Sequence, residues 1–277
     1  MSSCIFTNDN NIEIKLLDHI FTEKFRKRDN HEVIFRKINT YLINNNIILK
    51  NKNIIDLGAW VGDNSIPWAK NIYGTIYAID PSPDNISFIN NTCKLNDIKN
   101  VQCIQGCISD KNELLSTNDS LDHCSFVYGN TGVRGRSKVR AVTLDFLFNN
   151  NYIENIGYIH LDVEGMEYKV LLGSKTLINS FKPIISFEQH LDMDNYNLVL
   201  KYLLDNDYVV YLIDEILPGC RPSCRNSLAF HKSIFDEKII ENINKHIGRD
   251  VMIHYSLLSK YTFLNVGTNN FECVNIT

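Results

Sequence analysis

The organisation of this chain can be read from residues 53–65, whose sequence is Asn-Ile-Ile-Asp-Leu-Gly-Ala-Trp-Val-Gly-Asp-Asn-Ser. A short apolar run ends at Asp56, two glycines follow at Gly58 and Gly62, and a helix is expected to begin near Asp63. In doubly wound α/β domains, a strand, a glycine turn and a helix in this order bring backbone close to a nucleotide-like ligand. Glycine accepts positive φ there and places no Cβ against the ligand. The spacing is G-x-x-x-G, which also fits a tight turn that binds no ligand. Residues later in the chain must therefore distinguish a ligand-binding turn from a purely structural one.

Composition limits the class of protein. The chain has 277 residues, 44% of them apolar, which is enough for one large α/β domain or two small ones. The net charge of −4, without a dense Lys/Arg block, argues against tight binding to nucleic acid as the function. The apolar runs are much shorter than the ~18 residues of a membrane helix. The first residues lack the basic and apolar regions of a signal peptide. We therefore expect a cytoplasmic protein with no membrane partner.

The sequence contains eight cysteines, and reduced thiols are expected in a chain of this length without a secretion signal. Cys220 and Cys224 have a spacing that could supply two zinc ligands. No second Cys/His pair lies at ligand spacing nearby in the sequence, so the sequence alone does not predict a zinc site.

The chain is predicted to have three parts. Residues 1–50 are expected to form a helical preface, because apolar residues recur at helical spacing over residues 12–25 and 32–42. These helices could cap a cleft or pair subunits of a homo-oligomer. The main domain is expected over residues 51–232, followed by a mixed helical extension over residues 233–277 that packs on the same domain.

Strands and helices alternate along the main domain, which predicts a mostly parallel sheet. Because no helix separates the last two strands, one edge strand is expected to run antiparallel. The predicted strands are residues 53–56, 75–79, 101–105, 157–161, 183–187, 208–213 and 227–231.

Acidic residues end four of these strands, at Asp56, Asp80, Asp162 and Glu188. Ligands of open α/β sheets bind outside the carboxyl ends of the strands. In nucleoside-binding folds, a carboxylate about 20 residues after the glycine turn accepts hydrogen bonds from ribose. Asp80 is therefore predicted to bind ribose, and its alternative role is to begin the next helix. Crowded carboxylates raise one another's pKa and are candidates for acid–base chemistry or metal binding.

Three further candidates lie two residues from these acids, where extended backbone places both side chains on one side. Glu164 follows Asp162, His190 follows Glu188, and His160 precedes Asp162. Each has a structural alternative. Glu164 fits a helix N-terminus, which favours acidic residues, His160 fits a hydrogen-bonded core histidine, and His190 fits an ordinary loop residue.

The end of the strand at residues 101–105 is a candidate contact for an adenine ring, through Cys107 and Ile108. Residues 117–136 are predicted to form either an irregular or hairpin segment over the cleft or an exposed mobile loop. Four basic residues at and just after the C-terminal end of this segment are possible substrate contacts: Arg134, Arg136, Lys138 and Arg140.

Over roughly residues 53 to 231, the sequence resembles the FkbM family of S-adenosylmethionine-dependent methyltransferases. The turn Asp56–Gly62 resembles the family motif D-x-G-A-N-x-G, with Trp60 in place of the usual Asn. Asp80–Pro83 resembles the motif E-P-x-P, with Asp in place of Glu.

Three later motifs follow in the same order. Thr143–Asp145 resembles T-L-D, and Phe187–His190 resembles F-E-x-H. His160–Glu167 resembles K-x-D-x-E-G-x-E, with His160 in place of the usual lysine. A cation at that position would therefore depend on pH, since histidine titrates near ~6.5.

The resemblance implies a Rossmann-like class I methyltransferase fold: a seven-stranded, mostly parallel sheet with helices on both faces and one antiparallel edge strand. It implies S-adenosylmethionine as the cofactor. The residues expected to bind it are Asp56, Gly58, Ala59, Trp60, Gly62, Asp80, Pro81, Ser82, Cys107 and Ile108.

The resemblance also implies methyl transfer to a hydroxyl, most often of a sugar or natural product, so a small-molecule or glycan hydroxyl acceptor is expected. Asp162 or His190 is the predicted base, and Glu164 and Glu188 are predicted to orient the base or substrate. His160 is the fifth predicted catalytic residue. If a divalent cation such as Mg²⁺ binds, Asp162 and Glu188 are its expected ligands.

Three alternatives stay open. An RNA-directed methyltransferase would use the basic cluster at residues 134–140. A nicotinamide-dependent oxidoreductase shares the sheet, but the G-x-x-x-G spacing and the acidic motif argue against it. A catalytically silent cofactor-binding or structural protein would explain Trp60 and His160.

Overall fold

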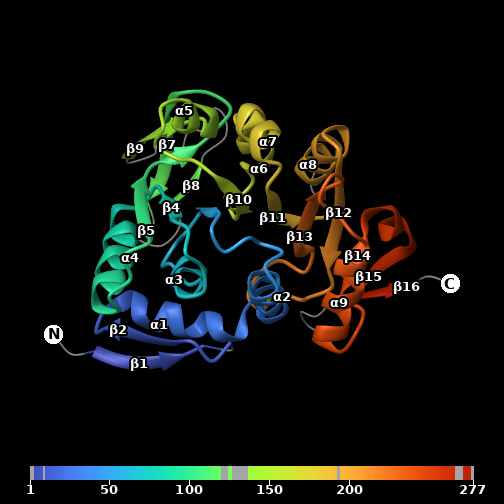
Figure 1. The fold of residues 1–277 in the computed structure, drawn as a ribbon, viewed down its shortest axis with the longest axis horizontal. Coiled ribbons are helices and arrows are strands. Elements are labelled where there is room, and N and C mark those ends of the chain that lie inside the picture. The colour runs from blue at the N-terminus through green and yellow to red at the C-terminus, as the bar shows by residue number, and fades with distance from the viewer. Residues whose placement is uncertain are drawn as a thin grey trace.

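The computed structural model describes residues 3–8, 10–119, 124–126, 137–191, 194–265 and 271–275. Among these residues, eight strands form one central sheet in the order β14-β12-β13-β11-β10-β3-β4-β5 (Figure 1). The strands are β3 (Asn53–Leu57), β4 (Ile76–Asp80), β5 (Val101–Gln105), β10 (Ile156–Leu161), β11 (Ile184–His190), β12 (Tyr208–Ile213), β13 (Cys224–His231) and β14 (Met252–His254).

The sheet confirms the Rossmann-like fold and corrects two details. From β5 through β4, β3 and β10 to β11, every neighbouring pair is parallel. The antiparallel strand β13 lies inside the sheet, between β11 and β12, and is not an edge strand. The short strand β14 then pairs antiparallel with β12, which makes eight strands where seven were expected. This eighth strand comes from the C-terminal extension, where three residues carry too little pattern to be recognised.

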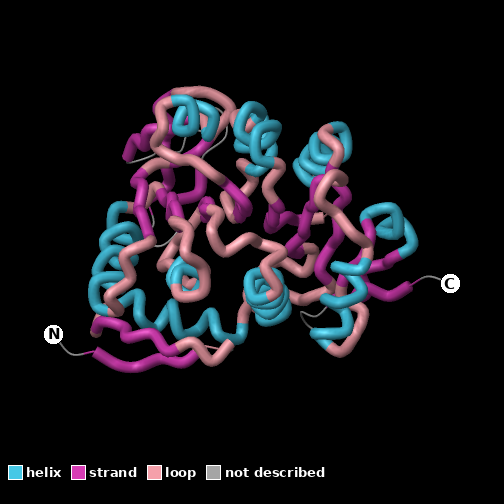
Figure 2. The backbone as a smooth tube through the Cα atoms, viewed as in Figure 1, coloured by secondary structure: helices cyan, strands magenta, loops and turns pink. Residues whose placement is uncertain are grey.

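Helices cover both faces of the sheet, as predicted (Figure 2). Ile54, Tyr158 and Ile184 point to one face, and their neighbours Ile55 and Ile159 point to the other, because successive residues of a strand alternate. The first face packs against α2 (Val33–Asn44), α3 (Ser65–Ala69) and α9 (Lys238–Ile247). The second packs against α5 (Leu144–Asn149), α6 (Glu167–Leu172), α7 (Lys175–Phe181) and α8 (Asp194–Asp205).

The N-terminal segment is only partly helical. It begins with a hairpin of β1 (Ser3–Thr7) and β2 (Glu13–Leu17), followed by α1 (Ile20–Lys27), a short 3₁₀ turn (Arg28–Asn30) and α2. The expected helix over residues 12–25 is wrong in its first half, because Ile14 and Leu16 are buried while Glu13 and Lys15 are exposed, a period of two. The hairpin packs on α4 (Pro83–Leu95), where Asn96 exchanges hydrogen bonds with the backbone of Lys15 at 2.8 and 2.7 Å.

Smaller elements complete the described chain. A second sheet has the order β6-β9-β7-β8 and is formed by β6 (Cys107–Ile108), β7 (Glu113–Asp119), β8 (Cys124–Phe126) and β9 (Ser137–Val142). The segment predicted over residues 117–136 overlaps β7 and β8, which pair antiparallel and so agree with its hairpin alternative. The rest of the segment lies outside the described residues. The C-terminal extension continues with a 3₁₀ helix (Tyr255–Lys260) and a hairpin of β15 (Tyr261–Asn265) and β16 (Phe271–Asn275). Among the described residues, no helix combines the length and apolar character needed to cross a membrane.

Gly58 fixes how the β3–α3 turn meets β10. Its φ is +78°, and a Cβ on it would lie 1.8 Å from the backbone oxygen of Asp162. The neighbouring Leu57 carbonyl accepts a hydrogen bond from the Asp162 amide at 3.0 Å. The backbone of β10 therefore occupies the space that any side chain at position 58 would need.

We expect Gly58→Ala to unfold the protein or to destabilise it by several kcal/mol. The matched control is Gly248→Ala, because Gly248 has a φ of +88° and a Cβ added to it would meet nothing within 4 Å. Gly248→Ala should cost only the positive-φ strain of about 1–2 kcal/mol. Urea unfolding of both variants measures the loss of unfolding free energy. Equal losses would contradict the prediction, because they would mean that the backbone at Asp162 moves aside for a Cβ at position 58 at little cost.

Candidate functional site

A cavity of about 350 Å³ opens at the carboxyl ends of the parallel strands. Strand ends and following turns from β3, β4, β5, β10 and β11 supply most of its wall, as expected for a doubly wound sheet. The N-terminal segment and the loop between β12 and β13 supply the remainder. The main residues at its wall are Arg28, His31, Asp56, Gly58, Ala59, Trp60, Asp80, Pro81, Cys107, Ile108, His160, Asp162, Glu164, Glu188 and Cys220.

The Asp80 carboxylate, at the end of β4, accepts three hydrogen bonds. One carboxylate oxygen accepts hydrogen bonds from the Ser82 amide at 2.8 Å and from the Asn85 side chain at 3.0 Å. The other accepts from the Trp60 amide at 2.9 Å. Ser82, and not Asp80, is the N-cap of α4. Asp80 therefore joins the glycine turn to the start of α4 while its side chain forms part of the cavity wall.

Asp56 is almost fully buried at the end of β3 and accepts a hydrogen bond from the Ser65 hydroxyl. Burial raises the pKa of this carboxyl to about 7, and the Asp63 and Asp80 carboxylates add to the rise while the Ser65 hydrogen bond opposes it. Asp56 thus ties the β3 end to the first residue of α3.

Most of the predicted cofactor residues come together in this cavity. Eight of the ten form part of its wall, and Gly62 and Ser82 do not. Gly62 instead packs against the side chains of Ile66 and Ile89. Its role is therefore in the packing of α3 against α4.

The acidic candidates gather at the other end of the same cavity. Asp162, Glu164 and Glu188 all reach it. Burial raises the pKa of Asp162 well above its usual range, and the Glu188 and Glu32 carboxylates raise it further. Burial also raises the pKa of Glu188, helped by Glu32. The expectation of mutually perturbed carboxyls at adjacent strand ends therefore agrees with this geometry.

The family profile described as the methyltransferase FkbM domain matches residues 56–210. The chain belongs to this FkbM family. The match begins at Asp56 and covers the glycine turn, Asp80, Asp162 and Glu188, so the whole carboxylate-lined cavity end lies within the FkbM domain. No curated protein sequence matches the chain.

Solved structures with a similar fold are distant in sequence. A methyltransferase FkbM from Methylobacillus flagellatus KT is 16% identical, with a TM-score of 0.48, and the match covers 66% of this chain and 44% of that one. This chain thus spans less than half the length of that protein. An O-methyltransferase from Bacillus cereus in complex with SAH is 10% identical, with a TM-score of 0.45 and coverage of 72% and 81%. The precorrin-6y C5,15-methyltransferase from Geobacter metallireducens GS-15 is 13% identical, with a TM-score of 0.43 and coverage of 73% and 87%.

His160 of the FkbM domain is a neutral core residue. It is 2% exposed, its Nδ1 lies 2.9 Å from the Ser186 hydroxyl, and its ring packs on Phe35 and Trp68. Burial lowers its pKa to about 4, although the Glu32 and Asp63 carboxylates act in the opposite direction. At neutral pH it therefore provides no positive charge where the resembled motif has lysine.

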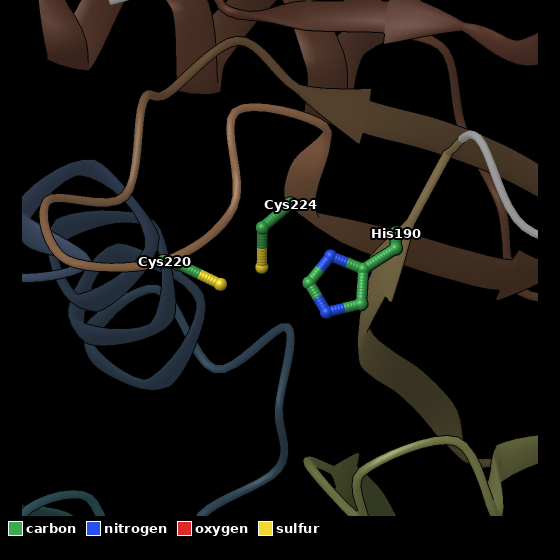
Figure 3. A group of neighbouring side chains, drawn as sticks. All are labelled: His190, Cys220 and Cys224. Atoms are coloured by element: carbon green, nitrogen blue, oxygen red, sulfur yellow. The ribbon is translucent and has the colours of Figure 1, made fainter. Parts of the chain in front are cut away.

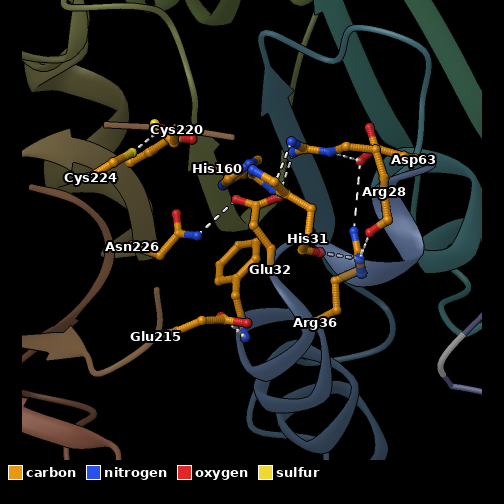
Figure 4. Close-up of polar contacts among 12 residues, drawn as sticks. Arg28, His31, Glu32, Arg36, Asp63, His160, Glu215, Cys220, Cys224 and Asn226 are labelled. Carbon is orange, nitrogen blue, oxygen red and sulfur yellow. Dashed lines mark hydrogen bonds and ion pairs between the residues drawn. The ribbon is translucent and has the colours of Figure 1, made fainter. Parts of the chain in front are cut away.

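The positive charge in the cavity comes instead from Arg28, in the N-terminal segment (Figure 4). Its guanidinium donates to Asp63 at 2.8 Å and to Glu32 at 2.5 Å, and contacts the His31 ring nitrogen at 2.8 Å. Burial alone would lower the pKa of Arg28, but the carboxylates of Glu32, Asp63 and Asp162 outweigh it and raise it. Arg26, Lys27 and Arg28 form a short basic run, a pattern that predicts a solvated helix end, but this prediction is wrong for Arg28, whose side chain is 17% exposed.

Glu32 links this cluster to the opposite half of the molecule. It is fully buried with a φ of +56°, and it accepts a hydrogen bond from the Asn226 side chain on β13 at 2.8 Å. Burial alone would raise its pKa, but Arg28 lowers it overall. Glu215 lies nearby, and its carboxylate accepts hydrogen bonds from the Ile34 and Phe35 amides at the start of α2, at 2.8 and 2.9 Å. Sequence reasoning missed Glu32 because its partner Asn226 lies 194 residues later in the chain, at a distance that no local pattern indicates.

His190 faces a neighbouring cavity of about 210 Å³. Asp162, Glu164 and Glu188 border both cavities, so His190 lies behind the acidic group. Its ring also lies beside Cys220 and Cys224. No local sequence pattern indicates this neighbourhood, because pairing of β11 with β13 creates it.

The basic cluster is only partly described. Arg134 and Arg136 lie outside the described residues. Lys138 and Arg140 belong to β9, and Arg140 lies at a separate shallow surface hollow and not at the main cavity.

Removal of the Arg28 charge should destabilise the fold. We expect Arg28→Met to cost about 3–5 kcal/mol of unfolding free energy, because Glu32 stays buried without its guanidinium partner. Arg26→Met is the matched control, since Arg26 is an exposed neighbour on α1. Urea unfolding at neutral pH measures both, and a loss in Arg28→Met no larger than in the control would show that the ion cluster contributes no stability.

The neutral state of His160 should give stability a pH dependence. Its pKa is lowered on folding from 6.5 to about 4, so the unfolded state binds more protons between these values. The contribution of His160 is present above pH 6.5 and is lost as the pH falls towards 4, by up to about 3 kcal/mol. We expect His160→Asn to flatten this part of the stability curve, measured by urea unfolding across the range. His246→Asn, at an exposed position on α9, is the control. Parallel curves for wild type and His160→Asn would contradict the prediction.

Proposed function

We propose that this FkbM protein is an S-adenosylmethionine-dependent O-methyltransferase whose acceptor is a hydroxyl of a sugar or glycan. The observation that carries the proposal is one cavity that joins the glycine turn and Asp80 to a group of three carboxyls. The first part suits a nucleoside cofactor, and the second suits an acceptor rich in hydroxyls.

The residues present fit the cofactor. Gly58 keeps the turn free of a Cβ, and the Asp80 carboxylate lies at the end of β4, where ribose hydroxyls are bound in related sheets. Cys107 and Ile108 add a mainly apolar surface at the end of β5, suited to a planar base. When bound, S-adenosylmethionine supplies a methyl group on a positively charged sulfur.

The acidic end of the cavity favours a neutral polyol as acceptor. Carboxylates accept hydrogen bonds from hydroxyls, and Asp162, Glu164 and Glu188 offer several such acceptors in one place. In their ionised forms, the same groups would repel the phosphates of RNA. The charge of the site therefore supports a sugar acceptor over the RNA alternative.

Asp162 is the strongest candidate for the base. It borders both cavities and is fixed by its backbone against Gly58 and Leu57, next to the cofactor turn. Its buried carboxyl has a raised pKa, so its ionised form holds a proton more strongly than an exposed aspartate would. Glu164 and Glu188 can orient the acceptor. Positioning of reactants contributes up to ~7–11 kcal/mol in such reactions, and a base adds about 10²–10⁴-fold.

The proposal predicts that Asp162→Asn retains cofactor binding but loses most methyl transfer. Wild type and Asp162→Asn should both bind S-adenosylhomocysteine with similar affinity, and neither should bind NAD, as measured by calorimetric titration. Methyl transfer should fall by about 10²–10⁴-fold in Asp162→Asn, because only the proton acceptor is lost. The assay follows formation of S-adenosylhomocysteine with a panel of monosaccharides, oligosaccharides and nucleotide sugars, and with an RNA oligonucleotide in parallel.

Asp205→Asn is the matched control, since Asp205 is an exposed residue on α8 that pairs with Lys201. It should retain both binding and transfer. Undiminished transfer by Asp162→Asn would remove Asp162 as the base, and transfer to RNA alone would overturn the sugar assignment. Failure of wild type to bind S-adenosylhomocysteine would overturn the cofactor.

A further inference from the structure

Three side chains that are good zinc ligands point toward one another beside the acidic group (Figure 3). They are His190, Cys220 and Cys224, and their potential ligand atoms all lie within 4.8 Å of one another. Cys224 is buried and the other two are half-buried.

The backbone fixes this arrangement. His190 is the last residue of β11 and lies directly opposite Cys224, the first residue of β13, in the antiparallel pair. Cys220 lies in the preceding turn, where its amide donates to the Leu217 carbonyl at 3.1 Å. The Cys224 amide donates to the Arg221 carbonyl at 2.9 Å. Sheet pairing and two turns therefore hold the three residues in place without a metal.

A fully buried arginine braces the same turn. Nη1 of Arg225 donates to the carbonyl of Pro222 at 2.8 Å and to that of Cys224 at 2.6 Å. These hydrogen bonds fix the backbone of the turn that carries Cys220 and Cys224.

Glu188 supplies a fourth potential metal ligand. It lies two residues before His190 on β11, and its Oε1 accepts hydrogen bonds from the thiols of both Cys220, at 3.5 Å, and Cys224. A carboxylate and two thiolates would repel one another, so this packing requires either protons on the sulfurs or a cation among the three groups.

We propose that His190, Cys220 and Cys224 bind a zinc ion, with Glu188 as the fourth ligand. Thiolate and imidazole ligands select zinc, whereas magnesium requires oxygen ligands. Binding replaces the two thiol protons, which are released to solvent, with two metal–sulfur bonds. The ion would attach the β12–β13 loop to β11, and that loop supplies Pro218, Gly219 and Cys220 to the wall of the main cavity.

This site does not depend on the proposed methyl transfer. A histidine that ligates zinc no longer serves as a free base, so the inference leaves Asp162 as the base. Zinc content and cobalt spectra can be measured without an acceptor or cofactor, so failure of one proposal can be told from failure of the other.

The test uses the full chain expressed in zinc-supplemented medium and purified with reductant. Wild type should contain about one zinc per chain by inductively coupled plasma mass spectrometry. After chelation, titration with Co²⁺ alone should give thiolate-to-cobalt charge-transfer bands and the visible absorption of tetrahedral cobalt. Cys220→Ser and Cys224→Ser should each lose the bound zinc and weaken the charge-transfer bands. Cys4→Ser is the matched control, because Cys4 is exposed on β1, and it should retain both.

Circular dichroism establishes that each variant is folded, and the wild-type cobalt spectrum tests the site even if a variant does not fold. Folded wild type with neither zinc nor a thiolate–cobalt band would overturn the proposal. Equal zinc content in Cys224→Ser and Cys4→Ser would also overturn it, as would a Cys220–Cys224 disulfide in protein kept in reductant.

Discussion

The close approach of β10 to the glycine turn is the constraint on which the rest of the site depends. Because Gly58 has no side chain, the backbone of Asp162 lies directly against it, and the Leu57 carbonyl accepts the Asp162 amide. This contact places the candidate base next to the turn that is expected to hold the cofactor. The absence of a Cβ at Gly58 thereby sets the distance between the candidate base and the turn that is expected to hold the cofactor.

The sequence predicted the parts of the site that depend on local pattern. Asp56, Asp80, Asp162 and Glu188 each end a short apolar run, and parallel strands bring such ends to one edge of a sheet, so their convergence followed from the pattern alone. The strands inside the sheet are predictable for the same reason. The hairpin at residues 3–17 was not predicted, since a helical and a two-residue period are hard to separate over so few apolar positions.

The parts that the sequence did not predict depend on contacts between distant residues. Arg28 lies in a basic run at a helix end, yet Asp63 and Glu32 surround it, and Glu32 accepts a hydrogen bond from Asn226, which lies 194 residues later in the chain. His190 and the two cysteines are likewise separated along the chain and joined by strand pairing. Buried ion pairs of this kind contribute little net stability but are costly to break, which favours one arrangement of the N-terminal segment over others.

The Glu32–Asn226 contact has a consequence for synthesis of the chain. Domains generally begin to fold from the N-terminus as they are made. The amide partner of Glu32 on β13 leaves the ribosome almost two hundred residues after Glu32. The charge at Glu32 must stay hydrated until β13 has been added. The ion cluster at the wall of the ligand cavity is therefore completed only after β13 has been made.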